Sequence, residues 1–365
     1  MKRVDIAVFA PSFGFGGAEK MTINLCRGFS EANLHVDLLI KNTHIPFKEL
    51  LNHPVRIIEL KRNKNGLISQ LSDYLTINKP KVLLSTKGGD KEAIEAKYKT
   101  KLDVKVVLRH GTTFSKRDEG KFFLKRIILH HKLKKIFPKA DLIVAVSKGV
   151  AKDIIKITKV PEQKVKVLPN PTVVPEMFEM AKESIDHPWF VEKKYPIILG
   201  AGGLRRSKDF PTLIRAFKIL RSKIPAKLVI LGEGRQRKKI ESLVYKLGLT
   251  NDVWLPGFRE NPYSFMKQAD LFVLSSLWEG SPNVLIEAMA LGTPVVSTDC
   301  PSGPGEILEN GKYGKLIPPA KPHKLAKAIL ETLKNPKRSD FLKKAVKKYS
   351  IENSIHAYLN ALGFY

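Results

Sequence analysis

Two series of short apolar runs, each alternating with helical patterns, constrain the fold more than any other feature. The first series extends from Val4–Ala10 to Val165–Leu168, and the second from Ile197–Ala201 to Lys315–Ile317. Short apolar strands that alternate with helices predict parallel sheets covered on both faces. The stretch 170–196 between the two series contains four prolines and few strand signals, so we place a domain boundary there.

The pattern therefore predicts an α/β protein with two Rossmann-like, doubly wound domains in tandem, and a length of 365 residues suits two domains. We expect an N-terminal domain over residues 1–175, a linker over 176–195 and a C-terminal domain over 196–348. Two such domains imply a cleft between them, and their ligands bind beyond the carboxyl ends of the strands. The residues that follow the strands are the first candidates for a functional site.

The chain is strongly basic, with 64 lysines and arginines, 35 acidic residues and a net charge of +29. This excess predicts an anionic partner: a phosphorylated ligand, a nucleic acid or an acidic membrane surface. The two cysteines have no paired spacing, which argues against a disulfide scaffold or a zinc ribbon and fits a reducing cytosol. No apolar run reaches the roughly 18 residues of a membrane span. We expect a cytoplasmic protein that can lie on a membrane.

A glycine-rich loop follows the first expected strand and leads into a helix. Its sequence, Gly14-Phe15-Gly16-Gly17-Ala18-Glu19, starts like a dinucleotide-binding turn but has Glu19 in place of the third glycine, and it lacks the GK[ST] of a P-loop. Free N–H groups at the start of such a helix can hold a phosphate. A tight strand-to-helix turn without a ligand is the alternative interpretation.

A basic loop, Gly202-Gly203-Leu204-Arg205-Arg206-Ser207-Lys208, follows the first strand of the second series. Its glycines permit close approach of the backbone, and its three cations supply charge for a diphosphate. The alternative is a solvated basic loop. Its position at the carboxyl end of a strand favours phosphate contact.

Two glutamates eight positions apart form the most specific pattern in the chain. A strand ends at Ser275, a turn carries Glu279, a helix begins near Pro282, and Glu287 lies within that helix. The two carboxylates can bind hydroxyl groups at opposite ends of a ligand. The exposed N–H groups at Ser281–Val284 suit the phosphate oxygens between them. Chance surface charge is the alternative, and the apolar surroundings weaken it.

This run, Glu279-Gly280-Ser281-Pro282-Asn283-Val284-Leu285-Ile286-Glu287, resembles the EX7E motif of the family 4 glycosyltransferases. The resemblance implies the GT-B fold, with the nucleotide-sugar donor mainly on the C-terminal domain, the acceptor on the N-terminal domain, and a final helix, 349–365, that crosses back to the N-terminal domain. Further segments are similar to the same family: Gly16–Glu19, Asp141–Ser147, Leu168–Asn170, Lys208–Ile214, Val229–Gly234 and Gly292–Pro304.

The resemblance also implies roles for individual residues. Glu287 would bind the ribose hydroxyls, Glu279 the hydroxyls of the donor sugar, and Lys208 the leaving diphosphate. His110 would lie near the donor sugar and Phe258 would border the base. The diphosphate would also meet Gly16, Gly17, Ser281, Asn283 and Val284. Many family members have an arginine where this chain has Gly203, so Arg205 or Arg206 is expected to replace it.

The resemblance therefore implies a retaining transfer of a hexosyl or N-acetylhexosaminyl group from a UDP-linked donor. No residue is evident as the carboxylate nucleophile of a double displacement. The chain has no Asp-x-Asp sequence, so no bridging metal and no cofactor beyond the nucleotide-sugar co-substrate are expected. Lys208 and helix N-termini would neutralise the charge that develops on the diphosphate.

The segment Phe114–Ala140 holds nine lysines and arginines against two acids, interleaved with apolar residues. A basic amphipathic helix of this kind can lie on an anionic membrane. We therefore expect a lipid-linked saccharide or surface glycan precursor as acceptor, at the cytoplasmic face of the membrane. A helix packed on its sheet with a solvated basic face is the alternative. Nucleic acid is not an expected partner, because no binding motif is present.

Two other functions are compatible with the sequence. A soluble nucleotide-sugar enzyme of the same fold, such as an epimerase or a disaccharide synthase, would use the same donor site. A non-catalytic protein that binds anions would use only the positive charge. Turnover of a nucleotide sugar distinguishes the enzymes from the binding protein.

Overall fold

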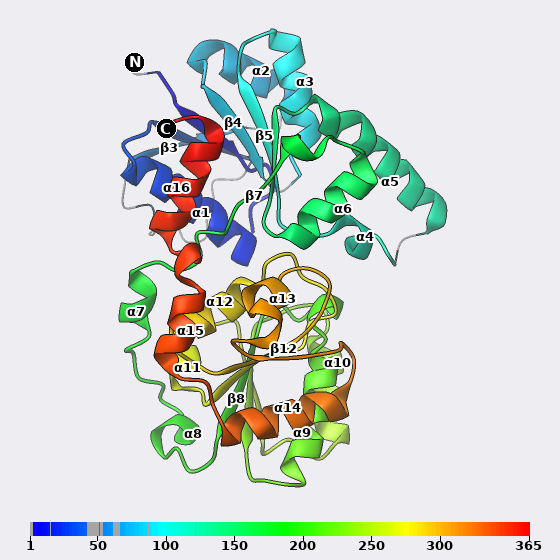
Figure 1. Ribbon diagram of the computed structural model, residues 1–365, viewed down its shortest axis with the longest axis vertical. Helices are drawn as coiled ribbons and strands as arrows, with labels where there is room; N and C mark the ends of the chain where they lie inside the picture. The colour runs from blue at the N-terminus through cyan, green and yellow to red at the C-terminus, as the bar shows by residue number, and fades with distance from the viewer. Residues whose placement is uncertain are drawn as a thin grey trace. The chain divides into compact units, whose positions relative to one another are not determined.

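The computed structural model describes residues 3–14, 16–41, 51, 54–60, 66–86, 88–120 and 122–365. The chain divides into two compact units, Met1–Pro171 with Ile351–Tyr365 and Thr172–Ser350 (Figure 1). The division lies at 171/172, and residues 176–195, where a linker was expected, belong to the second unit and contain two short helices. Phe15 of the glycine loop and Lys121 of the basic segment lie outside the described residues.

The first unit contains a parallel sheet of seven described strands in the order β3-β2-β1-β4-β5-β6-β7. Its central strands are buried along their whole length because helices cover both faces of the sheet. The strands are β1 (Ile6–Phe9), β2 (Val36–Ile40), β3 (Val55–Glu59), β4 (Val82–Thr86), β5 (Lys105–His110), β6 (Leu142–Ala145) and β7 (Val165–Val167). The helices are α1 (Gly17–Glu31), α2 (Gly66–Asn78), α3 (Asp90–Thr100), α4 (Phe114–Arg117), α5 (Phe123–Ile136), α6 (Lys148–Thr158) and α16 (Ile351–Leu362).

The last helix, α16, packs on the first unit. Its Tyr358 is fully buried, and the hydroxyl accepts a hydrogen bond of 2.9 Å from Arg109 Nε at the end of β5. Arg109 Nη2 also donates to Asn170 Oδ1 at 2.5 Å, and Ser354 Oγ donates to the carbonyl of Asn170 at 3.1 Å. A buried arginine therefore connects β5, the end of the first segment and α16.

The second unit contains a parallel sheet of six described strands in the order β10-β9-β8-β11-β12-β13. Helix α9 begins with a proline in its first turn, and its apolar residues at helical spacing bury one face against the sheet and α14. The strands are β8 (Ile197–Ala201), β9 (Lys227–Leu231), β10 (Val253–Gly257), β11 (Leu271–Leu274), β12 (Val295–Thr298) and β13 (Lys315–Ile317). The helices are α7 (Glu176–Met180), α8 (Pro188–Val191), α9 (Phe210–Arg221), α10 (Arg237–Lys246), α11 (Tyr263–Gln268), α12 (Asn283–Ala290), α13 (Pro304–Ile307), α14 (Pro322–Lys334) and α15 (Ser339–Ala345).

The predicted fold class is confirmed, since both units are helix-covered parallel sheets. The apolar runs that open and close the two predicted series correspond to β1, β7, β8 and β13. The pattern missed β3, because it is an edge strand whose residues are exposed or only half-buried and which includes Arg56 and Glu59. Ser147 caps helix α6 by accepting a hydrogen bond of 3.3 Å from the Val150 amide.

Candidate active site

Loops that follow β8, β11 and β12 meet at the carboxyl edge of the sheet in the second unit. The amide of Leu277 donates to the carbonyl of Ser207 at 2.7 Å, which joins the β11 loop to the β8 loop. Ser302 Oγ, after β12, donates to the carbonyl of Gly280 at 3.0 Å. These bonds hold the three loops at the edge where parallel sheets bind ligands.

Lys208 and Glu279 form an ion pair at this edge. Lys208 Nζ lies 2.7 Å from Glu279 Oε1, which also accepts a hydrogen bond of 2.6 Å from Ser276 Oγ. The side chains are 21% and 12% exposed, so the pair is sheltered but open to a ligand. Because an ammonium group has three N–H donors, Lys208 can keep this contact and still donate to an anion.

Two glycines bring the backbone close to the lysine. Gly202 has a φ of +145°, and a Cβ there would lie 3.1 Å from Cε of Lys208. Gly232, with a φ of +130°, approaches so closely that its Cβ would lie 2.1 Å from the carbonyl oxygen of Gly202. Larger residues cannot take these positions, so the basic loop depends on both glycines.

Both candidate arginines of this loop are exposed, but only one lies beside Gly203. A Cβ on Gly203 would meet Arg205 Nε at 3.2 Å. The Arg205 side chain therefore fills the space next to the position at which many family members have their own arginine. No comparable contact places Arg206 there among the described residues.

The start of α12 combines amide donors with a buried hydroxyl. Leu285 N–H makes the first bond back to the carbonyl of Pro282, at 3.1 Å, so the amides of Asn283 and Val284 precede the intrahelical ladder. Ser281 Oγ is buried and has no hydrogen-bond partner among the described residues. A buried hydroxyl without a partner is unusual, and a bound anion would satisfy it.

Glu287 lies one turn inside α12 and is 5% exposed. The buried hydroxyl of Tyr263, on α11, donates to Glu287 Oε1 at 3.4 Å. Phe258 follows β10 at the same edge of the sheet and is 45% exposed. The edge therefore carries an oriented carboxylate and an exposed aromatic ring.

Cys300 lies close enough to Lys208 and Glu279 for their charges to affect the pKa of its thiol. Burial raises the pKa of its thiol to about 12, and the negative charge of Glu279 adds to this effect. The thiol is therefore protonated at physiological pH, so the site does not stabilise a thiolate at Cys300.

His110 ends β5 in the first unit. Its ring contacts Phe114 and Phe137, with centroid distances of 5.0 and 4.9 Å. Nε2 lies 3.3 Å from Asp90 Oδ2, but it has no partner with hydrogen-bond geometry among the described residues. Asp90 Oδ1 accepts a hydrogen bond of 3.2 Å from Ser85 Oγ. The histidine is thus a buried group that is held between two aromatic rings and a carboxylate.

The glycine loop of the first unit leads to Glu19, a carboxylate for which the sequence pattern predicted no role. Gly16 precedes α1, and a Cβ on Gly16 would lie 3.1 Å from Glu19 Oε2. A glutamate at the third helical position that turns back to the helix start is typical of a capping box. A phosphate at Gly16 and Gly17 would approach this negative charge, whereas a phosphate at Lys208 would approach a cation.

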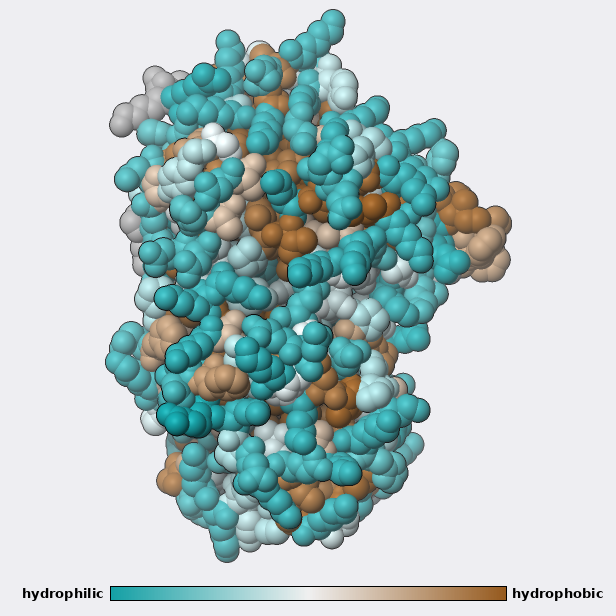
Figure 2. Space-filling model, viewed as in Figure 1, coloured by the Kyte–Doolittle hydropathy of each residue, from teal (hydrophilic) through white to brown (hydrophobic). Residues whose placement is uncertain are grey.

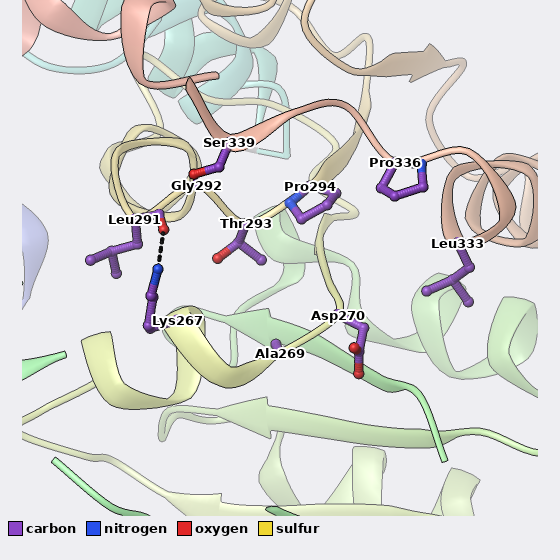
Figure 3. A pocket seen from close by; sticks show the side chains of 10 residues that line it. All are labelled: Lys267, Ala269, Asp270, Leu291, Gly292, Thr293, Pro294, Leu333, Pro336 and Ser339. Carbon is purple, nitrogen blue, oxygen red and sulfur yellow. Dashed lines mark hydrogen bonds between the residues drawn. The ribbon is translucent and has the colours of Figure 1, made fainter. Parts of the chain in front are cut away.

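A separate pocket of about 340 Å³ lies at the opposite, amino-terminal edge of the second sheet (Figure 3). It is lined by residues just before β11 and β12, among them Asp270 and Pro294, and Lys267 Nζ donates to the carbonyl of Leu291 within it at 3.4 Å. The predicted site residues do not line it. In parallel α/β sheets this edge is not the usual ligand site.

Comparison with known proteins finds a matching family model for each half of the chain. Residues 181–349 match Glycosyl transferases group 1, and residues 15–173 match Glycosyltransferase Family 4. The chain belongs to the family 4 glycosyltransferases. It is therefore an enzyme that transfers glycosyl groups, which replaces the non-catalytic alternative.

Relatives of this glycosyltransferase include proteins from a bacterium and an archaeon. The N-acetylgalactosamine-N,N'-diacetylbacillosaminyl-diphospho-undecaprenol 4-alpha-N-acetylgalactosaminyltransferase of Campylobacter jejuni is 29% identical over 94% of this chain and 92% of the relative. An uncharacterized glycosyltransferase of Methanocaldococcus jannaschii is 37% identical over 54% of this chain and 52% of the relative. The match thus spans about half the length of the archaeal relative.

Solved structures confirm the GT-B fold of this glycosyltransferase. A glycosyltransferase of Rickettsia africae has a TM-score of 0.81 at 17% identity, covering 100% of this chain and 99% of that one. HepE of Anabaena, solved with UDP-glucose, has a TM-score of 0.81 at 19% identity, with 100% of both chains covered. These similarities concern the fold alone.

Sequence reasoning missed three residues that orient the predicted ones. Ser276 donates to Glu279, Tyr263 donates to Glu287, and Asp90 lies beside His110. Ser276 and Asp90 follow predicted strands at their carboxyl ends, so their positions were a usable signal. No such signal marked Tyr263, because it lies on α11 and not on α12, the helix that carries Glu287.

Proposed function

We propose that this glycosyltransferase moves a hexosyl or N-acetylhexosaminyl group, with retention of configuration, from a UDP-linked donor to a lipid-linked saccharide or other glycan precursor at a membrane. The sheltered pair of Lys208 and Glu279 carries this proposal, together with the buried hydroxyl of Ser281, which has no hydrogen-bond partner among the described residues. The name of the Campylobacter jejuni relative describes transfer to a diphospho-undecaprenol-linked acceptor, and HepE was solved with UDP-glucose. Both support this choice of substrates.

In this proposal the diphosphate binds where cations and amide donors converge. Lys208 Nζ and the guanidinium of Arg205 bind its oxygens, together with the amides of Asn283 and Val284 and the hydroxyl of Ser281. Departure of the nucleotide increases negative charge on the diphosphate, and donors that are already oriented stabilise that charge without reorganisation. Protein cations, rather than a divalent ion, supply the positive charge.

The two glutamates then define the ends of the donor. Glu287, oriented by Tyr263, accepts hydrogen bonds from the ribose hydroxyls, and the ring of Phe258 borders the uracil. Glu279 accepts from hydroxyls of the sugar while it holds Lys208 in position. Its negative charge also favours the oxocarbenium character of the sugar in the transition state.

Retention follows when the acceptor hydroxyl attacks from the side of the leaving diphosphate. Burial raises the pKa of the Cys300 thiol, which disfavours a covalent intermediate on this residue. The departing phosphate oxygen can accept the acceptor's proton, so the glycosidic bond forms as the bond to phosphate breaks. In this proposal a ring N–H of His110 donates to the donor sugar, and Asp90 Oδ2, 3.3 Å from Nε2, orients the imidazole.

Thermal unfolding with added ligands tests the donor site. We expect UDP, and not ADP or duplex DNA, to raise the melting temperature at fixed salt. A ligand at about 100 times its Kd stabilises the fold by about 2.7 kcal/mol. In Glu287→Gln we expect about ten-fold weaker UDP binding, since one charged hydrogen bond is replaced by a neutral one. Stabilisation by DNA alone would contradict the proposal, as would release of UDP from UDP-sugars that is independent of added acceptor lipid.

A further inference from the structure

Helix α5 differs from the other long helices of the first unit because none of its residues is buried. Thirteen large hydrophobic side chains are exposed among the described residues, and five of them gather within seven positions: Phe122, Phe123, Leu124, Ile127 and Ile128. Figure 2 shows the corresponding apolar projection at the right-hand edge of the molecule, where α5 begins in Figure 1. Monomeric soluble proteins rarely expose so concentrated an apolar patch.

The helix has two different sides. Leu133 and Ile136 pack against the core of the first unit, so the inward side is occupied. The outward side carries Leu124, Ile127 and Ile128 in its first turns. Its last turns carry cations instead, at Lys134 and Lys135. Packing on the sheet accounts for the inward residues only and leaves the outward apolar residues unexplained.

Unbalanced positive charge surrounds the patch. Helix α5 contains five lysines and arginines and no acidic residue. The two acids that precede it are already paired: Arg117 Nε lies 2.9 Å from Asp118 Oδ1, and Lys116 Nζ lies 2.8 Å from Glu119 Oε1. The surface thus combines exposed apolar side chains with cations that have no acidic partner on the same helix.

We propose that the segment Phe122–Ile128 enters the interface of an anionic lipid bilayer, while the cations of α5 bind the lipid headgroups. This proposal rests on the proposed function, because it brings the enzyme to a lipid-linked acceptor. Charge complementarity selects this occupant: a second copy would set cations against cations, and a nucleic acid would leave the phenylalanines and isoleucines in water. The helices of the described ranges are too short or too polar to cross a membrane, and α5 would lie in its surface.

Sedimentation with vesicles tests the proposal. We expect the full-length protein to bind vesicles that contain phosphatidylglycerol and to bind pure phosphatidylcholine vesicles far less. Leu124→Ser with Ile128→Ser should reduce partitioning at least ten-fold, and Lys134→Gln with Lys135→Gln should reduce it more than ten-fold at low salt, at about five-fold per cation. The control is Ile77→Ser, an even more exposed apolar residue on α2, which should leave binding unchanged.

Further readouts separate the possible failures. Each variant should keep the wild-type melting temperature and its response to UDP, since the altered residues are exposed. Equal vesicle binding by the wild type and the Leu124→Ser, Ile128→Ser variant would overturn the membrane proposal. So would a wild-type dimer in sedimentation velocity that this variant dissociates, since the patch would then cover a second copy. Vesicle binding without any response to UDP would leave the membrane proposal standing and refute the donor site.

Discussion

The carboxyl edges of the two sheets share one architecture and differ in chemistry. In the second unit this edge holds the Lys208–Glu279 ion pair, amide donors and a second glutamate. In the first unit it holds His110, set among aromatic rings with one carboxylate nearby, and a glycine loop with its own glutamate. The fold thus supplies two sheet edges of the kind at which ligands bind. The residues that follow the strands determine which ligand suits each edge. At the edge of the second unit, the ion pair with Glu279 holds Lys208 in place, which fits the diphosphate role that we propose for it.

Substitution of the lysine should sharpen this difference most. Lys208→Met keeps the aliphatic stem that lies against Gly202 and removes the charge. We expect a loss of about 10²–10³ in kcat/KM, the effect of removing one donor to a developing anion. Turnover of a UDP-sugar measures it, and Lys218→Ala on the exposed surface of α9 is the control. Unchanged turnover in Lys208→Met would show that the cation has no part in catalysis.

Substitution of His110 should distinguish the contribution of the first unit's edge from that of the second. In His110→Ala we expect kcat/KM for the UDP-sugar to fall about ten-fold, because one hydrogen bond to the sugar is lost. The affinity for UDP should stay the same, since UDP has no sugar to contact. Asp90→Asn should give a smaller loss of the same kind. An equal loss of UDP affinity in His110→Ala would instead indicate that the histidine binds the nucleotide.

A comparison of two neighbouring arginines should give a smaller effect. Arg205→Ala should weaken UDP binding about five-fold, which is the contribution of a partly exposed ion pair. Arg206→Ala should change it less, because only Arg205 lies beside Gly203. Titration calorimetry of both variants measures the difference. The reverse order of effects would assign the compensating charge to Arg206.

The smallest effect concerns pH. The pKa of Cys300 is about 12 in the fold against an ordinary value of 9.0, so the unfolded chain loses its thiol proton first as the pH rises. Stability relative to Cys300→Ser should therefore fall as the pH rises from about 9 to about 12, and part of this fall already lies between about pH 8 and about pH 10. Glu279→Gln should make this fall smaller, because it removes a negative charge next to the thiol. Denaturant unfolding at the two pH values measures both, and equal falls would place the carboxylate away from Cys300.

Sequence patterns were sufficient to predict the candidate residues that lie in loops directly after a strand. Lys208 and Glu279 follow strands whose apolar runs are unmistakable, so the order of residues was enough to infer their shared edge. A partner from another element could not be inferred, since Tyr263 reaches Glu287 from α11. Within the basic loop the sequence left Arg205 and Arg206 as alternatives, and the local turn brings Arg205 beside Gly203. The donor roles of these residues remain predictions.

The basic segment shows a second limit of sequence patterns. Its charge and apolar content predicted either membrane contact or packing on the sheet. The structure assigns Leu133 and Ile136 to packing and leaves Leu124 and Ile128 exposed. A pattern cannot make this division, because apolar residues lie on both sides of the helix. Only the position of α5 against the first unit distinguishes its two sides.

A crystal structure with UDP bound tests the central claim most directly. We expect a diphosphate within hydrogen-bond distance of Lys208 Nζ and of the amides of Asn283 and Val284, with the ribose hydroxyls on Glu287. Ser281 Oγ should gain the partner that it lacks. UDP bound in the pocket of Lys267 and Asp270 at the opposite edge of the sheet, or held by Gly16 and Gly17 without Lys208, would contradict it.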